Sequence, residues 1–169
     1  MNEPESGFFH EPELPQASRE LEELRAKEGY VAPFEVIRRR VVDDSLSGRV
    51  AIDAIVVVKI GAEEELEAAR GVGGVHALDS ALRKVLSRHF PAIASVRVTE
   101  SYTHGSGEGT EGEVISVKKF TDGKRQWSTL RKSTDIVEAG WLSLLDGYEW
   151  KIWMEEKKNK GANRELRTR

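Results

Sequence analysis

The sequence repeats its own pattern after 62 residues, and this internal repeat restricts the fold more than any other feature. In each copy, strand-like segments are followed by a turn and then by an amphipathic helix. The offset aligns small and apolar residues with one another: Gly61 with Gly123, Val75 with Val137, Ala77 with Ala139, Leu82 with Leu144, Phe34 with Val96, Val36 with Val98, Ile52 with Val114, and Ile55 with Val117. A chain built twice from one unit predicts a pseudo-symmetric domain, and such domains often bind ligands or partners along the symmetry axis.

Hydrophobic periodicity predicts three strands and one helix in each copy. The expected strands are residues 34–42, 50–60, 65–70, 94–104, 112–120 and 125–131, and the expected helices are residues 72–88 and 133–146. Ser133 or Thr134 is expected to cap the second helix, and Asp122-Gly123 to form a hairpin turn. Residues 148–153 alternate like a strand but would equally extend the helix. The predicted fold class is α+β, a tandem βββα–βββα pseudo-symmetric repeat with an antiparallel sheet and two packed helices.

The composition along the chain predicts three segments. The first is an acidic, linker-like lead with a short helix at about residues 16–28, the second is the repeat domain, and the third is a basic tail. Their limits are residues 1–30, residues 31–154 (with copies at about 33–91 and 95–153) and residues 155–169.

Composition also excludes several classes of protein. Of the 169 residues, 38% are hydrophobic and 33% are charged, as in a soluble globular domain with a real core. The longest apolar run, residues 54–58, is far shorter than the about 18 residues that a membrane-spanning helix needs. The chain has no cysteine, which removes disulfides and thiol chemistry and favours a cytoplasmic location. We therefore expect no membrane association.

Charge is spread unevenly along a chain whose net charge is −3. Residues 1–30 carry eight carboxylates against three bases, whereas residues 157–169 carry six bases against one carboxylate. The basic tail and residues 38–40 could contact nucleic acid. No aromatic residue is interleaved with the basic tail to stack on bases, so we expect a solvated terminus and no nucleic-acid partner.

No catalytic or metal-binding pattern is present in the sequence. The histidines His10, His76, His89 and His104 are scattered and lack the spacing of metal ligands. The adjacent carboxylates of residues 63–65 are expected to point different ways on a solvated edge. There is no nucleophile elbow. We therefore expect no catalytic residue, no metal and no cofactor.

Two glycine-rich segments remain as candidate binding features. Residues 71–74 lack the third glycine of a dinucleotide fingerprint, but the first-turn amides of the following helix could hold a small carboxylate. Alternatively, these glycines only allow tight packing. Residues 102–110 are either a ligand-closing segment or an ordinary flexible hairpin loop.

Two motifs resemble those of the C-terminal regulatory domain of the 2-isopropylmalate synthase and citramalate synthase family. Residues 71–84 read Gly-Val-Gly-Gly-Val-His-Ala-Leu-Asp-Ser-Ala-Leu-Arg-Lys, where the family typically has Gly-x-Gly-Pro-Val-x-Ala-Leu. Residues 127–130 and 133–141 read Trp-Ser-Thr-Leu and Ser-Thr-Asp-Ile-Val-Glu-Ala-Gly-Trp, similar to the family's Trp-x-Thr-Val-Gly-Val-Ser-x-x-Ile-Ile-Glu-Ala-Ser. The similarity covers about residues 34–153.

The resemblance implies two βββα units that dimerise and bind a small amino acid effector, leucine or isoleucine, between subunits. It also implies regulation of leucine or related branched-chain amino-acid biosynthesis without catalysis, because the family's separate TIM-barrel domain is missing from this sequence. The motifs depart from the family at Gly74, at residues 130–132 and at Ser101, where an aspartate often stands. The charges of Arg131 and Lys132 are expected to lie close to the effector pocket.

The residues give two main functional hypotheses. In the first, the chain is a homodimeric regulatory domain whose effector contacts Gly73, Gly74, Val75, Ser101, Tyr102, Ser133, Thr134, Asp135, Ile136 and Ala139. In the second, it is a structural dimerisation module that has lost effector binding, its pocket filled by Arg131 and Lys132, and that associates with a separate catalytic synthase subunit.

Overall fold

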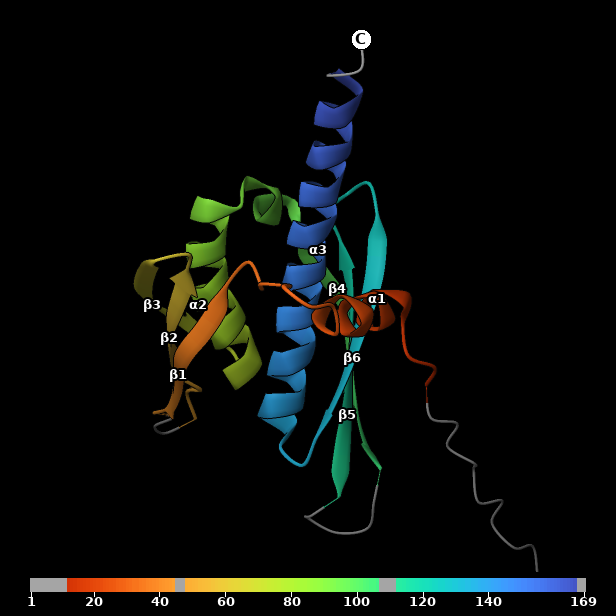
Figure 1. Cartoon of the computed structure of the whole chain (residues 1–169). Helices are drawn as coiled ribbons and strands as arrows, with labels where there is room; N and C mark the ends of the chain where they lie inside the picture. Colours follow the sequence, from red (N-terminus) through yellow and green to blue (C-terminus); the bar gives the residue numbers. More distant parts are fainter. Residues whose placement is uncertain (1–11, 45–47, 107–111, 167–169) are drawn as a thin grey trace, which may run out of the picture.

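Two three-stranded antiparallel sheets lie on either side of a pair of helices (Figure 1). The structure is a computed structural model that describes residues 12–44, 48–106 and 112–166. The first sheet has the order β1-β2-β3, the second has the order β4-β5-β6, α2 packs on β2 and β3, and α3 packs on β5 and β6. The elements are α1 (Gln16–Arg25), β1 (Glu35–Asp43), β2 (Ile52–Ile60), β3 (Glu63–Gly71), α2 (Gly74–His89), the 3-10 helix η1 (Pro91–Ser95), β4 (Arg97–Ser106), β5 (Glu113–Thr121), β6 (Gln126–Ser133) and α3 (Ile136–Leu166).

The tandem βββα–βββα repeat is confirmed, although each copy has its own sheet. Both helices begin at equivalent positions, Gly74 and Ile136, 62 residues apart. The registers agree as well, since Ile52 pairs with Gly71 and Val114 pairs with Ser133. The β-bulge between Val36 and Arg38 recurs between Val98 and Glu100 at the same offset. A bulge bends its strand and increases the local twist, so both sheets curve at the same place.

The turn between the second and third strands also recurs in both copies. Gly61 and Gly123 both have positive φ, 60° and 85°, a conformation that glycine adopts without a steric cost. At the second turn the Asp122 carboxylate accepts the backbone N–H groups of Lys124 (2.8 Å) and Arg125 (2.7 Å). The hairpin turn expected at Asp122-Gly123 is therefore confirmed.

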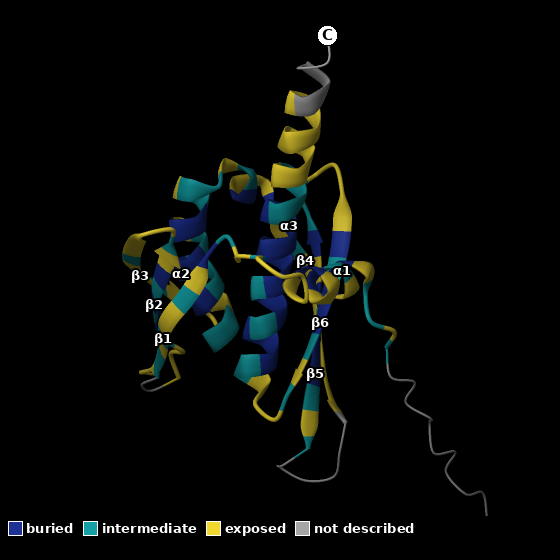
Figure 2. Cartoon of the chain, in the orientation of Figure 1, coloured by how far each residue is buried: buried dark blue, intermediate teal, exposed yellow. Residues whose placement is uncertain are grey.

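The hydrophobic core lies between the sheets and the helices (Figure 2). From the first sheet it receives alternate residues of β2, and from α2 it receives the residues of one helical face. In the second copy the ring of Phe120 stacks on Trp127, with 5.5 Å between centroids, and meets the edge of Tyr148. This packing fixes α3 on the second sheet.

Helix α3 is longer than the sequence pattern predicted. The pattern predicted a helix to about Asp146 and left open whether residues 148–153 extend it or form a strand. They extend it, and the helix continues through the basic tail to Leu166. Gly147 allows the close approach of the Phe120 ring, which would lie 2.1 Å from a Cβ atom at this position, and the packing of that ring holds the helix together across the glycine. Residues 148–152 are all buried, the charged Glu149 and Lys151 included, so the alternation of polar and apolar residues here does not follow a helical period. Beyond residue 155 the helix becomes exposed (Figure 2).

The short helix expected at about residues 16–28 is present as α1, and it contributes to the core. Ala17, Leu21 and Leu24 are buried against the domain. The Ser18 hydroxyl accepts the backbone N–H of Leu130 on β6 (3.0 Å). The Trp150 indole N–H donates to the Glu20 carboxylate (2.6 Å). Although the sequence analysis placed residues 16–25 in a linker-like lead, they lie against β6 and α3.

Two local predictions differ from the structure. Asp135, rather than Ser133 or Thr134, caps α3: its carboxylate accepts the Glu138 N–H (2.6 Å), while Ser133 Oγ accepts the Asp135 N–H (3.1 Å). Strand β4 extends to Ser106, so the first part of the expected loop is strand, and residues 107–110 lie outside the described residues. In the part of the chain that the structure describes, no helix combines the length and hydropathy of a membrane span.

Candidate functional site: a pocket between α2 and the second sheet

The N-terminal ends of α2 and α3 lie side by side. A Cβ atom on Gly74 would lie 3.6 Å from Val41 and 3.7 Å from Val137, and one on Gly140 would lie 2.9 Å from Val75. This approach places the two glycine- and serine-containing turns at one end of the molecule (Figure 1). The positive ends of two helix dipoles therefore lie in the same region.

The sequence allowed two interpretations of the glycine turn before α2, tight packing or space for a small ligand, and the structure has features of both. A side chain at Gly71 would come within 2.4 Å of the Ala77 backbone nitrogen, so this glycine is required for tight packing. Gly73 has no such neighbour within 4 Å and Gly74 has only ordinary contacts. Space therefore remains beside the first turn of α2.

A pocket of about 280 Å³ opens beside this first turn. Its lining comes from α2, β4, β5 and α3, and consists of Val75, His76, Asp79, Val98, Ser101, Lys118 and Leu144. His76 and Ser101 are exposed, whereas Lys118 and Leu144 are buried. Three aliphatic side chains and two oppositely charged groups thus share one small cavity.

Lys118 is the buried cation of this pocket. Its side chain stands on the middle strand β5 and is only 5% exposed. Ser101 is its direct neighbour on β4, and the Lys118 ammonium donates to the Ser101 hydroxyl (2.8 Å). Burial lowers the pKa of Lys118, while the nearby Asp79 charge acts in the opposite direction. A ligand carboxylate would supply the negative partner that favours the charged ammonium.

Asp79 is the anionic group of the same pocket. It lies on α2, and the Tyr148 hydroxyl donates to its carboxylate. Burial raises the pKa of the Asp79 carboxyl, and the hydrogen bond from Tyr148 and the charge of Arg83 only partly offset this. A cationic ligand group beside it would favour the ionised carboxylate.

The predicted effector residues fall into three groups in the structure. Two of them line the pocket, Val75 and Ser101. A second group lies at the N-terminal ends of the two helices beside it: Gly73, Gly74, Ser133, Thr134, Asp135 and Ile136. The third group lies away from the pocket. Tyr102 faces the opposite side of β4, near Lys119, and Ala139 is fully buried in the core.

Arg131 and Lys132 do not line the pocket, contrary to the expectation from the motif. Arg131 forms a two-pronged ion pair with Asp146 (2.6 and 3.0 Å), which Arg25 of α1 also contacts. Lys132 lies 3.9 Å from Glu113 on the neighbouring strand. The charges that were expected to fill the pocket instead stabilise α1, α3 and the second sheet.

Lys118 and Asp79 were not predicted as site residues, although the repeat contains a signal for them. The 62-residue offset aligns Lys118 with Val56 and Asp79 with Trp141, and both of these partners are core residues. A charged residue at a position that the other copy fills with a core residue indicates a specialised environment. His76, Val98 and Leu144 carry no comparable signal.

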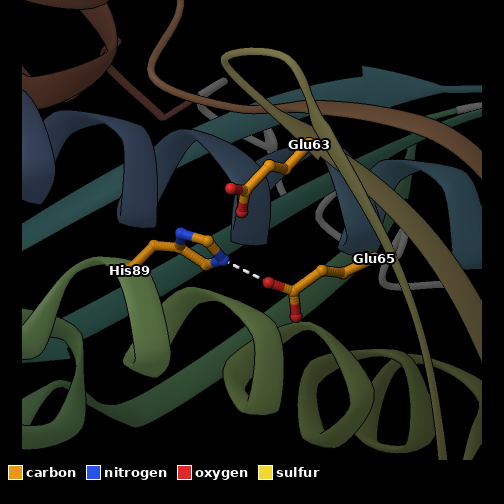
Figure 3. Close-up of side chains that lie close together, drawn as sticks. All are labelled: Glu63, Glu65 and His89. Atoms are coloured by element: carbon orange, nitrogen blue, oxygen red, sulfur yellow. Dashed lines mark hydrogen bonds and ion pairs between the residues drawn. The ribbon is translucent and has the colours of Figure 1, made fainter.

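A second cluster of ionisable side chains lies at the other end of α2. Glu63, Glu65 and His89 approach one another, with their ligand atoms within 4.8 Å (Figure 3). The two carboxylates were expected to diverge, but residues two apart on a strand share one face. The Arg88 guanidinium already bonds Glu65 and Glu67. A metal ion would have to compete with this arginine, so we assign no binding role to the cluster.

Comparisons with known proteins match the chain to one family. Residues 18–152 match the model of the LeuA allosteric (dimerisation) domain. The chain is 39% identical over 105 residues to the (R)-citramalate synthase of Sulfolobus acidocaldarius, covering 61% of this chain and 20% of that protein. It is 33% identical over 145 residues to the enzyme of the same name from Geobacter sulfurreducens, covering 83% of this chain and 28% of that protein. The chain therefore spans less than a third of the length of these relatives.

Proposed function

The chain belongs to the family of LeuA allosteric (dimerisation) domains, and from this premise we propose that it binds a small amino acid effector in the pocket between α2 and the second sheet. Membership of the family agrees with the resemblance drawn from the two sequence motifs. The regulatory role is a property of the family domain, whereas the effector and its site are our proposal.

The observation that supports this proposal is the pairing of opposite charges across a small, largely apolar cavity. An α-amino acid carries a carboxylate and an ammonium group on one carbon atom. Lys118 provides the cation for the carboxylate, and Asp79 provides the anion for the ammonium group. Hydrogen bonds between charged groups are stronger than neutral ones, and more so in a desolvated site.

The size and lining of the pocket favour a short aliphatic side chain. Its volume of about 280 Å³ lies at the lower end of the range of ligand pockets, which begins at about 300 Å³. Val75, Val98 and Leu144 supply the apolar contacts. We therefore propose an effector of the leucine or isoleucine class.

The proposed context is a homodimer that regulates a citramalate or isopropylmalate synthase of branched-chain amino-acid biosynthesis in the cytoplasm. The relatives are named (R)-citramalate synthase, and the chain matches only a part of each. We propose that catalysis belongs to a synthase domain or subunit with which this chain associates. A shift between two dimer arrangements that differ in effector affinity would carry the signal.

The alternative proposal is a structural dimerisation module without an effector, in which Arg131 and Lys132 fill the pocket. Arg131 pairs with Asp146 and Lys132 lies 3.9 Å from Glu113, so neither contact favours this alternative. The pocket is lined instead by Lys118 and Asp79. The two proposals differ in whether a ligand stabilises the chain.

A thermal unfolding screen tests the proposal. Leucine, isoleucine and valine are compared with leucinamide, which lacks the carboxylate, and with isocaproate, which lacks the ammonium group. At one hundred times the dissociation constant a ligand stabilises the folded state by about 2.7 kcal/mol, which corresponds to a shift of roughly 5–11 °C in Tm for a chain of this size. We expect a shift with a branched-chain amino acid and a smaller one with both analogues. No shift at millimolar concentrations of any amino acid would refute effector binding.

A further inference from the structure

The internal repeat gives the proposed pocket a twin in the first copy. The 62-residue offset, which reproduces strand registers and helix starts, assigns each lining residue an equivalent. Val75 corresponds to Val137, and Val98 corresponds to Val36. The four polar lining residues have very different equivalents: Glu138 for His76, Trp141 for Asp79, Arg39 for Ser101 and Val56 for Lys118.

The twin position is closed by the chain's own side chains. Trp141 is only 2% exposed and belongs to the core. The Arg39 guanidinium lies 6.0 Å from the centroid of the Trp141 ring and forms an ion pair with Glu138. Arg39 stands directly opposite Val56, just as Ser101 stands opposite Lys118. The closed twin therefore contains an apolar group, a cation and a carboxylate in contact.

We propose that Trp141 and Glu138 occupy in the closed twin the places that the effector occupies in the open pocket. This inference rests on the proposed function. Arg39 on the edge strand β1 is the cation of the twin, and Lys118 on the middle strand β5 is the cation of the pocket. They are opposite members of equivalent cross-strand pairs, Arg39 with Val56 and Ser101 with Lys118. Glu138 neutralises Arg39, as the effector carboxylate neutralises Lys118. In the twin, the Trp141 indole takes the part of the effector side chain. In the open pocket, that side chain would lie beside Val75 and Leu144.

Two properties of the site follow from this correspondence. Each chain has one effector site, because the second pseudo-equivalent place is permanently filled. The effector carries a carboxylate and a bulky apolar side chain on one small molecule, because those two groups are provided internally in the twin. Asp79, which has no charged counterpart in the twin, adds the selectivity for an ammonium group.

The first test opens the twin. The Trp141→Ala variant removes an indole that is 2% exposed and belongs to the core, and a cavity left in an apolar core binds small aromatic molecules. We expect calorimetry to show that this variant binds indole, which the wild type does not. Its leucine stoichiometry stays at one per chain, because Glu138 still neutralises Arg39 and the twin has no counterpart of Asp79. The matched control Trp153→Ala, on the same helix but only partly buried, keeps a stoichiometry of one and binds no indole. A folded Trp141→Ala variant that binds no indole would overturn the inference.

The reverse test closes the open pocket. The double variant His76→Glu/Asp79→Trp introduces the residue types of the twin beside Lys118. We expect leucine affinity to fall at least tenfold while Tm without ligand is equal to or higher than that of the wild type. Unchanged leucine affinity in the folded double variant would contradict the inference, and this variant decides the question if Trp141→Ala does not fold. If the wild type binds no leucine, the proposed function fails, whereas indole binding to Trp141→Ala still tests the twin independently.

Discussion

At the scale of single residues, two differences between otherwise similar repeats account for the character of the site. Lys118 and Asp79 replace the core residues Val56 and Trp141 of the sister copy. The family motif drew attention to the neighbouring glycines and to Ser101, but the charged lining could only be found by comparing the two copies position by position. Burial and hydrogen-bond partners, which decide what these charges can do, come from the tertiary structure.

We expect the free energy of unfolding to depend on pH through Asp79. Burial raises the pKa of its carboxyl above the ordinary value of 3.8, so the folded state holds the proton more tightly than the unfolded state. Stability therefore falls as the pH rises from about 3.8 through the higher folded pKa. The variant Asp79→Asn keeps an acceptor for Tyr148 but does not titrate. We expect urea unfolding to show that the wild type loses free energy of unfolding relative to this variant across that window. If the free energy of unfolding of the wild type relative to Asp79→Asn stays constant or increases with pH, the assignment is contradicted.

We expect replacement of Lys151 to cause a large loss of folding free energy. Its side chain is 6% exposed, and its ammonium contacts Asp122 at 2.7 Å and Glu155 at 2.5 Å. Removing one partner of a buried ion pair typically costs about 3–5 kcal/mol. The two backbone N–H groups that Asp122 also accepts place the cost here at the lower end of this range. We expect Lys151→Met to lower the free energy of unfolding by roughly this amount. The exposed Lys160→Met on the same helix serves as control, and equal effects of the two changes would disprove the role of the pair.

At the scale of elements, the sequence pattern was most informative where local chemistry is decisive. The strands and the start of α2 were predicted to within about three residues, because alternation and turn residues such as Gly123 act locally. The sequence left the end of α3 open, because residues 148–153 after Gly147 fit either a strand or a longer helix. The role of Gly147 depends on Phe120, which is distant in sequence and approaches it only in the folded chain.

Two glycines of α3 give a matched prediction about this element. Gly147→Ala would force a methyl group into the Phe120 ring, which is itself held against Trp127. Overpacking of this kind costs about 1–3 kcal/mol. Gly161→Ala meets no atom within 4 Å and gains helix propensity, worth up to about 1 kcal/mol. Chemical denaturation should show a lower free energy of unfolding for Gly147→Ala and a higher one for Gly161→Ala. If Gly147→Ala were stabilising, Gly147 and the Phe120 ring would not be in close contact.

At the scale of the whole molecule, the arrangement of the two copies could not be predicted from the repeat alone. A duplicated unit is compatible with one continuous sheet or with two, and the structure has two sheets with the helices between them. Helix α1 joins the second copy through contacts with β6 and α3 that span more than one hundred residues of sequence. Such long-range contacts leave no periodic signal in the sequence.

We expect the chain to form a dimer in solution. The family to which it belongs is a dimerisation domain, and two apolar residues are exposed at one end of the molecule. Val72 is 83% exposed and Ile136 is 60% exposed, each at the N-terminal end of one of the two adjacent helices. Exposed apolar residues gathered at one end of a molecule often mark an interface. We expect light scattering to give twice the chain mass for the wild type and the single-chain mass for Val72→Glu/Ile136→Glu. A wild type that is monomeric at micromolar concentration would contradict this expectation.

Calorimetric titration of two neighbouring lysine variants tests the central claim most directly. Lys118 faces the pocket, whereas Lys119 faces the opposite side of β5, near Tyr102. The ligand is the amino acid that gives the largest thermal shift. We expect Lys119→Met to bind this ligand as tightly as the wild type does. Lys118→Met should bind at least about tenfold more weakly, a loss of about 1.4 kcal/mol or more. Equal affinity of the two variants would show that the effector does not bind in this pocket.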